Sequence, residues 1–177
     1  GMGEPLLNYK NVLRSIHFIT SEEGLNMSYK RITLSTSGIS KMIRKLADDN
    51  VKVNLALSLH AANEELRKKI MPIGKSNTLE EIRDSLKYYF SKTKKKVTYE
   101  YVLLRDVNDS IEDAYQLYKY TKHLSSKVNI IEYNAVEGLE FKKSSFEKTE
   151  KFIGYLLKKG VNVSLRRSRG KDINAAC

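Results

Sequence analysis

The chain has 177 residues, of which 32 are lysine or arginine and 21 are aspartate or glutamate, so its formal net charge is +11. Hydrophobic residues make up 41% and charged residues 30%, a globular balance that excludes a disordered or fibrous chain. No apolar stretch approaches the roughly 20 residues of a membrane span, and the opening residues do not form a signal peptide. We therefore expect a cytoplasmic protein without membrane contact.

The excess of positive charge makes a polyanion the first partner to consider, and RNA or DNA ranks above an acidic protein. A basic surface that only keeps the protein soluble explains the charge equally well. The single cysteine, Cys177, excludes an internal disulfide and any site built from several thiolates. Any iron-sulfur cluster would need ligands from outside this chain.

Five segments have the alternating or β-branched apolar pattern of β-strands. They are residues 31–35, 51–59, 97–104, 128–133 and 161–165. Helix-like segments lie before and between them, with apolar residues along one face, at residues 12–19, 39–46, 79–90, 111–118 and 146–157. Strands that alternate with helices predict an α/β fold with a mainly parallel sheet and right-handed crossover connections.

Three residue pairs have the spacing of a capping box at a helix start, and they are Thr78 with Glu81, Ser110 with Asp113, and Ser144 with Glu147. In such a box each side chain accepts a hydrogen bond from the backbone of the other residue. The pair with aspartate is the weaker version. These pairs predict where three of the helices begin.

Polar residues fall on one face of several predicted strands. In the second strand the apolar residues alternate with Asn54, Ser58 and His60, which share the opposite face. A doubly wound sheet covered on both faces is usually apolar throughout, so one polar face favours a barrel or partial barrel around a wet cavity. An antiparallel sheet with one solvated face is the alternative. We expect Ser35, His60 and Glu100 to face the concavity, with the helices outside.

Several polar residues lie where parallel strands end, which is where α/β folds bind ligands. Gly3 and Glu4 would bring backbone and a carboxylate close to a ligand, although a plain turn explains them too. Ser35 ends the first strand and could equally cap the next helix. His60, after the second strand, could bind a ligand, but such a histidine is more often structural. Asn134, after the fourth strand, could instead be a turn residue.

The end of the chain is basic. Arg166, Arg167, Arg169 and Lys171 lie close together in the sequence, which suits contacts to nucleic-acid phosphates without reading the base sequence. A solvated basic tail is an equal alternative. Cys177 is either inert or a nucleophile presented on a loop. The other histidines have no companion at metal-ligand spacing, so we predict no metal-binding residues.

In combination, these segments resemble the RlmN/Cfr family of radical S-adenosylmethionine RNA methyltransferases. The resemblance rests on the order and spacing of GMGEPL, RITLSTSG, LALSLHA, IMPI, YEYVLLRDVNDS, VNIIEYN and LRRSRGKDINAAC. One departure is Glu132, where the family commonly has proline. The resemblance implies a radical S-adenosylmethionine βα barrel that is incomplete here, because the family's CxxxCxxC cluster loop lies upstream of the GMGEP turn.

The resemblance also implies that residues 1–177 are the carboxyl-terminal portion of a catalytic domain, without its cluster loop and amino-terminal domain. The implied cofactors are S-adenosylmethionine and a [4Fe-4S] cluster whose ligands lie upstream of this chain. Residues that resemble the family's contacts to S-adenosylmethionine are Gly3, Glu4, Ser35, Ser58, Leu59, His60 and Asn134. Gly3 and Glu4 among them resemble the turn that holds the methionine ammonium group.

Cys177 resembles the cysteine that takes a methyl group from one S-adenosylmethionine. In the family, a radical from a second S-adenosylmethionine then abstracts hydrogen from the methylthio group, and the carbon radical adds to adenine. The expected product is adenosine methylated at carbon 2 in large-subunit ribosomal RNA and in some transfer RNAs. The expected partners are these RNAs and a reducing system for the cluster. The fragment alone should be inactive.

Two other functions stay open. Cfr-type members methylate carbon 8 of the same adenosine, and nothing in these residues separates the two positions. The other is a noncatalytic basic RNA-binding module that has kept the barrel sequence. With the first strands of the barrel missing, an open sheet edge should be exposed, and such edges favour non-native self-association.

Overall fold

The structure is a computed structural model, and it describes residues 3–71, 76–135, 138 and 140–166. The β-strands in these residues are β1 (Thr33–Thr36), β2 (Asn54–Ser58), β3 (Val97–Leu103), β4 (Ser126–Glu132) and β5 (Val163–Arg166). The α-helices are α1 (Tyr9–Thr20), α2 (Ser40–Asp48), α3 (Glu64–Ile70), α4 (Leu79–Thr93), α5 (Ile111–Thr121) and α6 (Phe146–Lys158). Short 3-10 turns lie at Pro5–Asn8 and Tyr29–Arg31.

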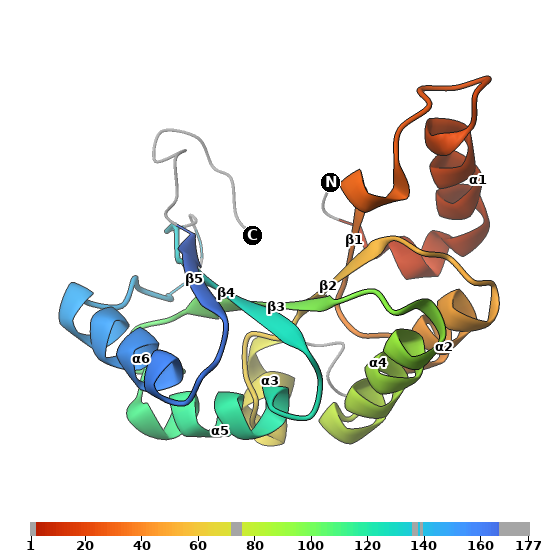
Figure 1. The fold of residues 1–177 in the computed structure, drawn as a ribbon. Coiled ribbons are helices and arrows are strands. Elements are labelled where there is room, and N and C mark those ends of the chain that lie inside the picture. Colours follow the sequence, from red (N-terminus) through yellow and green to blue (C-terminus); the bar gives the residue numbers. More distant parts are fainter. Residues whose placement is uncertain (1–2, 72–75, 136–137, 139, 167–177) are drawn as a thin grey trace.

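The strands form one sheet, in which their spatial order is their order in the chain and each neighbouring pair is parallel. The helices α2 to α6 lie on one side of this sheet, and its other side is concave (Figure 1). We call this concave face of the sheet the trough. This arrangement confirms the predicted α/β fold with parallel strands and outer helices, and the antiparallel alternative is wrong. Because β1 and β5 end the sheet as separate edges in the described residues, the fold is a partial barrel.

The core lies between the sheet and the helices. Alternate residues of β3 pack there, and Tyr99 and Tyr101 are fully buried. The ring of Tyr99 meets that of Tyr120 from α5 at 5.8 Å between centroids, and the ring of Tyr101 meets that of Phe152 from α6 at 5.5 Å. Such ring pairs contribute about 0.5–1.5 kcal/mol each beyond their burial. The aromatic residues therefore fix the two helices against the centre of the sheet.

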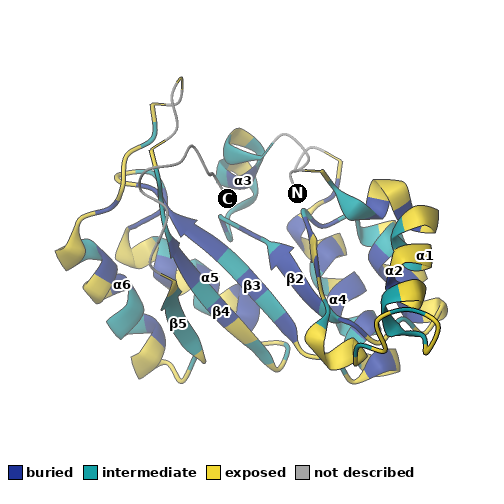
Figure 2. Ribbon diagram, turned by 90° about the horizontal axis from the view of Figure 1, so that it is seen from above, coloured by how far each residue is buried: buried dark blue, intermediate teal, exposed yellow. Residues whose placement is uncertain are grey.

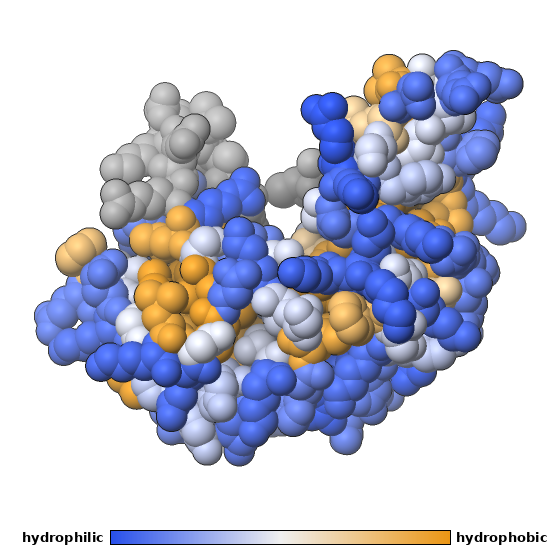
Figure 3. Space-filling view, in the orientation of Figure 1, coloured by the Kyte–Doolittle hydropathy of each residue, from blue (hydrophilic) through white to orange (hydrophobic). Residues whose placement is uncertain are grey.

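Burial falls toward the last strand. The central strands are largely buried, whereas β5 is only partly covered (Figure 2). On the surface in Figure 3, apolar side chains gather over β5 and α6 among hydrophilic ones. Val163 and Leu165 of β5 and Ile153 of α6 are partly buried residues that pack against the core. The sheet thus ends at β5 with a thin apolar layer.

Two of the three predicted helix starts are confirmed. Thr78 and Glu81 form a complete capping box at the start of α4. Ser110 and Asp113 form another at the start of α5, so the aspartate version is as complete as the glutamate version. In both boxes the serine or threonine oxygen accepts from a backbone N–H in the first helical turn, which would otherwise lack a partner.

The predicted start of α6 is wrong by one residue. Ser145, not Ser144, is the N-cap, and its side chain accepts from the backbone N–H of Lys148 at 3.2 Å. Ser144 is buried, and its hydroxyl donates to Asp109 Oδ2 at 2.6 Å. Ser144 therefore forms a tertiary hydrogen bond with Asp109 and does not cap the helix, as the sequence pattern had predicted it would.

The sequence pattern also missed α3. Its residues are mostly charged, and its one fully buried side chain is Arg67, so it has no apolar stripe to reveal it. Asn63 caps it, with the side-chain oxygen accepting from Leu66 N–H at 3.0 Å. None of the helices in the described residues is long and apolar enough to cross a membrane.

Candidate functional site

The concave face of the sheet carries a row of polar side chains. Ser58, Glu100, Asn129 and Ser164 lie level with one another across β2 to β5. Asn129 donates through Nδ2 to Glu100 Oε1 at 2.9 Å, and Ser164 donates through its hydroxyl to Asn129 Oδ1 at 2.8 Å. The alternation predicted from the sequence is therefore present, and Glu100 faces the concavity as expected.

One carboxylate oxygen of Glu100 lacks a hydrogen-bond donor in the described residues. Oε2 is buried and accepts no hydrogen bond from the part of the chain that the structure describes. A buried acceptor without a donor costs about 1–3 kcal/mol, so native proteins rarely leave one unpaired. The level residue in the next strand, Ser58, is half-buried. This part of the trough offers an acceptor to a ligand that carries hydroxyl or amino groups.

The opening turn is held against the end of β1 by Glu4. Its Oε1 accepts from Leu6 N–H at 3.0 Å and from the Thr36 hydroxyl at 2.9 Å. Its Oε2 accepts from the Ser37 N–H at 2.7 Å and the Ser37 hydroxyl at 2.6 Å. A carboxylate has about four lone-pair sites, so donors within the protein occupy them all. Gly3 beside it is exposed, and a Cβ atom added there would meet no atom of the described residues within 4 Å.

Ser35 lies on the concave face of β1. It is exposed, whereas its neighbours Leu34 and Thr36 are buried. Its alternative role as a helix cap is wrong, because the N-cap of α2 is Ile39, and the Ser40 N–H at the helix start donates to the Asn77 side chain instead. Ser35 is therefore placed where the prediction requires, at the carboxyl end of an edge strand and open to the trough.

His60 follows β2 with a left-handed backbone, at φ 56°. Its Nδ1 accepts from the Val102 N–H at 3.2 Å, and its carbonyl accepts from Asn108 Nδ2 at 2.7 Å. Burial, and then the charge of Arg67, lowers the pKa of His60 to about 4. The ring is thus neutral at pH 7, and since Nδ1 is an acceptor, the proton sits on Nε2. His60 is structural at one nitrogen and a hydrogen-bond donor at the other.

Leu59 contributes differently from its neighbours. Its side chain is fully buried in the core, and its backbone N–H donates to the Glu100 carbonyl at 2.9 Å. The His60 N–H donates to the same carbonyl at 3.3 Å. These bonds end the β2 ladder before the predicted strand end. Because the Leu59 side chain is buried, only its backbone could contact a ligand.

Asn108, which the sequence analysis did not single out, joins the ends of β2 and β3. It is fully buried, and its Oδ1 accepts from Leu104 N–H at 2.7 Å. Its Nδ2 donates to the carbonyls of His60 and Val102 at 2.7 and 2.8 Å. Its own carbonyl accepts from the Tyr101 hydroxyl at 3.0 Å. Asn108 therefore fixes the position of the His60 backbone.

Arg67 lies beneath the same edge and was also missed. Its side chain is 1% exposed, and Nη2 donates to the carbonyl of Ser37. Nε and Nη1 have no partner in the described residues. Burial lowers the pKa of Arg67. This buried positive charge is one reason that the ring of His60 stays neutral.

The remaining predicted residues are placed only in part. Asn134 is half-buried just beyond the end of β4, at the carboxyl edge of the sheet. Arg166 ends β5 and is exposed. Arg167, Arg169, Lys171 and Cys177 lie outside the described residues. No group of three potential metal ligands occurs in the ranges that the structure describes.

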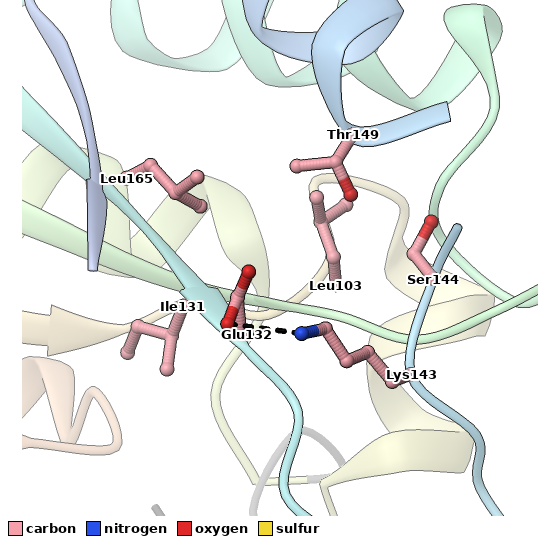
Figure 4. A pocket seen from close by; sticks show the side chains of 7 residues that line it. All are labelled: Leu103, Ile131, Glu132, Lys143, Ser144, Thr149 and Leu165. Atoms are coloured by element: carbon pink, nitrogen blue, oxygen red, sulfur yellow. Dashed lines mark ion pairs between the residues drawn. The ribbon is translucent and has the colours of Figure 1, made fainter. Parts of the chain in front are cut away.

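A small recess lies beside this edge, between the ends of β3 to β5 and the start of α6 (Figure 4). Across it, Lys143 Nζ lies 3.0 Å from Glu132 Oε2. Glu132 is the residue that departs from the family pattern. Because its carboxylate is paired with a lysine of the connection to α6, the departure is accommodated locally.

Comparisons with known proteins agree with this geometry. A model of the Radical SAM superfamily matches residues 1–118, and the chain belongs to this superfamily. Proteins named probable dual-specificity RNA methyltransferase RlmN are 55% identical in Flavobacterium psychrophilum and 51% identical in Christiangramia forsetii, each over 177 residues. These matches cover 100% of this chain and 51% and 50% of the relatives, so the chain spans about half their length.

Solved structures give the same result. A radical SAM methyltransferase from Sphaerobacter thermophilus superposes with a TM-score of 0.95 at 38% identity, covering 100% of this chain and 52% of that one. Streptococcus suis SuiB bound to S-adenosylmethionine superposes with a TM-score of 0.63 at 16% identity, covering 94% of this chain and 38% of that one. The second likeness shows the fold alone.

Proposed function

We propose that this chain is the carboxyl-terminal portion of the catalytic domain of a radical S-adenosylmethionine RNA methyltransferase. Its reaction is methylation of carbon 2 of adenosine in large-subunit ribosomal RNA and in some transfer RNAs. The observation that carries the proposal is 55% identity over the whole chain to a relative named for dual-specificity RNA methylation. The enzyme acts in the cytoplasm, together with a reducing system for its cluster.

S-adenosylmethionine would lie in the trough, along the carboxyl edge of the strands. It carries hydroxyl and amino donors as well as a carboxylate, and when bound it supplies the methyl group and, at a reduced cluster, the radical. The unpaired Glu100 Oε2 and the open space beside Gly3 fit such a ligand. His60 would donate from Nε2, and Ser35 would donate or accept from the edge strand.

The other predicted contacts have more limited roles. Ser58 would reach the ligand from the polar row, and Leu59 only through its backbone. Asn134 would bound the site beyond β4. Glu4 would act mainly by holding the Gly3 turn in place, because the protein already fills its hydrogen-bonding sites.

The [4Fe-4S] cluster would have to be held from outside this chain, since the only cysteine is Cys177. We assign Cys177 the role of methyl carrier. Its thiolate would attack the methyl carbon of the sulfonium, forming a sulfur–carbon bond while the bond to the sulfonium breaks. Arginine and lysine residues that precede Cys177 in the sequence would favour the ionised thiol, and Arg166, Arg167, Arg169 and Lys171 would contact RNA phosphates.

The isolated chain should self-associate. The outer edge of β1 has no strand partner in the described residues. Exposed strand edges pair with other chains unless they are covered. Sedimentation of the isolated chain should show oligomers that the longer natural protein does not form.

The experiment that tests the function uses the full-length protein, wild type and Cys177→Ala, with ribosomal RNA as substrate. Mass spectrometry of the digested RNA should find 2-methyladenosine with the wild type and no methylation with the variant. Binding of S-adenosylmethionine should survive in the variant, since it does not depend on that sulfur. Methylation at carbon 8, or methylation by the alanine variant, would overturn the proposal.

A further inference from the structure

The edge of the sheet opposite the candidate site is strongly basic. In a parallel sheet every helix-to-strand connection returns to the amino end of the strands, so these connections meet at one edge. Three of them, residues 94–96, 122–125 and 159–162, enter β3, β4 and β5. Figure 2 shows exposed connections at the amino ends of these strands, along the lower edge of the view.

Lysines fill these connections. Residues 94–96 are three lysines in succession. Lys122 opens the second connection and Lys127 follows it, while Lys158 and Lys159 lie at the third. We call these seven side chains the lysine rim. All but the half-buried Lys95 are exposed.

Within the three connections no negative charge offsets the rim, and the acidic residues at the same edge, Asp48 and Asp49, lie at the end of α2 beside the entry to β2. Residues 91–97, 121–128 and 157–163 contain no aspartate or glutamate. None of the rim lysines forms an ion pair with another described residue. Lysines elsewhere in the described chain do form such pairs, as Lys148 does with Asp106 and Asp109. The rim is therefore a concentrated positive field rather than a balanced surface.

A neighbouring histidine lies among Lys122 of the rim and two cations of α4. His123 is exposed in the second connection. Its pKa is lowered, by desolvation first and then by the charges of Lys87, Lys122 and Arg83. Cations that disfavour a further cation at this point would favour an anion there.

Tyrosine rings lie among these lysines. Lys122 and Lys159, from different connections, each lie 5.9 Å from the ring centre of Tyr118, and Lys159 lies 5.7 Å from that of Tyr155. These contacts show that the second and third connections lie close together, at the carboxyl-terminal ends of α5 and α6. The positive charges thus form a continuous surface across strands β4 and β5.

We infer that the lysine rim is a second contact surface for the substrate RNA, which binds its phosphates at the end of the barrel opposite the methylation site. This inference rests on the proposed function for the identity of the polyanion. Lysine ammonium groups are point charges that suit phosphates and carry no base specificity. The seven residues of β3, at about 3.3 Å each, span about 23 Å. A structured RNA is longer than this, so one molecule can reach both edges.

The test is the salt dependence of RNA binding by the full-length protein. The rim variant is Lys94→Gln with Lys127→Gln and Lys159→Gln, one change per strand entry. The matched control is Lys94→Arg with Lys127→Arg and Lys159→Arg, which keeps every charge in place. The probe is an unmodified transfer RNA, with poly-L-glutamate as the alternative polyanion.

The glutamine variant should bind the RNA at least tenfold more weakly at about 0.1 M salt, and its plot of log affinity against log salt should be shallower by about 2. The arginine variant should match the wild type. Wild-type affinity and slope in the glutamine variant would overturn the inference. So would unchanged RNA binding with lost binding of poly-L-glutamate, because the rim would then fit an acidic protein. Binding is measured without methylation, so failure of the proposed reaction would be seen separately.

Discussion

The two edges of the sheet are built in opposite ways. At the carboxyl edge, polar groups such as Asn108 and Glu4 are buried or half-buried, and several hydrogen bonds tie each of them to the surrounding chain. At the amino edge, the rim lysines are exposed apart from Lys95, and none of them forms an ion pair with another described residue. Chemistry on one atom of a substrate requires fixed groups, whereas phosphate attraction requires only charge. We therefore expect the carboxyl edge to position the reacting groups and the amino edge to supply affinity for RNA.

The largest effect should come from removing the buried link at the carboxyl edge. Asn108→Ala would leave the Leu104 N–H and the carbonyls of His60 and Val102 without a partner. At about 1–3 kcal/mol for each unpaired group, the free energy of unfolding should fall by about 4 kcal/mol. Urea denaturation of the chain measures this. Asn162→Ala, at the amino edge, should change it by less than about 0.5 kcal/mol. Equal effects would contradict the contrast between the two edges.

The second effect concerns pH. The pKa of His60 is lowered to about 4 in the folded chain, by burial and then by Arg67, from an ordinary value near 6.5. Between these values the unfolded chain binds a proton that the folded chain does not, so stability should fall as the pH drops from about 6.5 to about 4. The loss is at most about 3 kcal/mol.

A matched variant isolates the contribution of this ring. Asparagine accepts a left-handed backbone and can place an oxygen near the position of Nδ1, so His60→Asn should keep the fold. It cannot titrate, so most of the pH dependence between 4 and 6.5 should disappear. A nitrogen NMR titration of the wild type should show the His60 proton on Nε2. Protonation near pH 6.5 would contradict the assignment.

Smaller losses of unfolding free energy are expected from the two serines before α6, and the two losses should differ. Ser144→Ala removes the donor to the buried Asp109 and should cost about 2 kcal/mol. Ser145→Ala removes a helix cap and should cost about 1 kcal/mol. Thermal unfolding of the two variants gives the order. A larger loss at Ser145 would mean that the predicted capping pattern, rather than the tertiary bond, dominates here.

The smallest effect is expected at the ion pair across the recess. Lys143 is half exposed, so its pairing with Glu132 should contribute less than about 1 kcal/mol. Lys143→Ala should therefore lower the unfolding free energy by less than that, and less still in high salt. A loss of several kcal/mol would show that the carboxyl edge relies on charge as well as on buried hydrogen bonds.

The sequence predicted those features that depend on local periodicity. The parity of β2 and β3 placed Glu100 in the trough, and the apolar spacing of residues 79–90 and 111–118 found α4 and α5. Asn108 and Arg67 escaped notice because their roles arise between distant segments. Asn108 bonds His60 across 48 positions, and Arg67 bonds Ser37 across 30. No pattern within a short window contains such a contact.

The lysine rim also could not be predicted from short sequence patterns. Each of its lysine pairs or triplets is unremarkable in the sequence, where charge alone was compatible with a merely soluble surface. Only the parallel topology, which returns connections 94–96, 122–125 and 159–162 to one edge, brings them together. The parallel topology therefore gathers lysines that are far apart in the sequence at the amino edge of the sheet.

The most direct test of the account separates catalysis from RNA affinity in the full-length enzyme. Methylation of ribosomal RNA is followed while the RNA and S-adenosylmethionine concentrations are varied, for His60→Asn and for the glutamine variant of the rim. We expect His60→Asn to impair the use of S-adenosylmethionine and to leave the KM for RNA unchanged, whereas the rim variant should raise the KM for RNA at least tenfold with kcat unchanged. A rim variant that lowers kcat, or a His60→Asn enzyme with wild-type kinetics, would contradict the division of roles between the two edges.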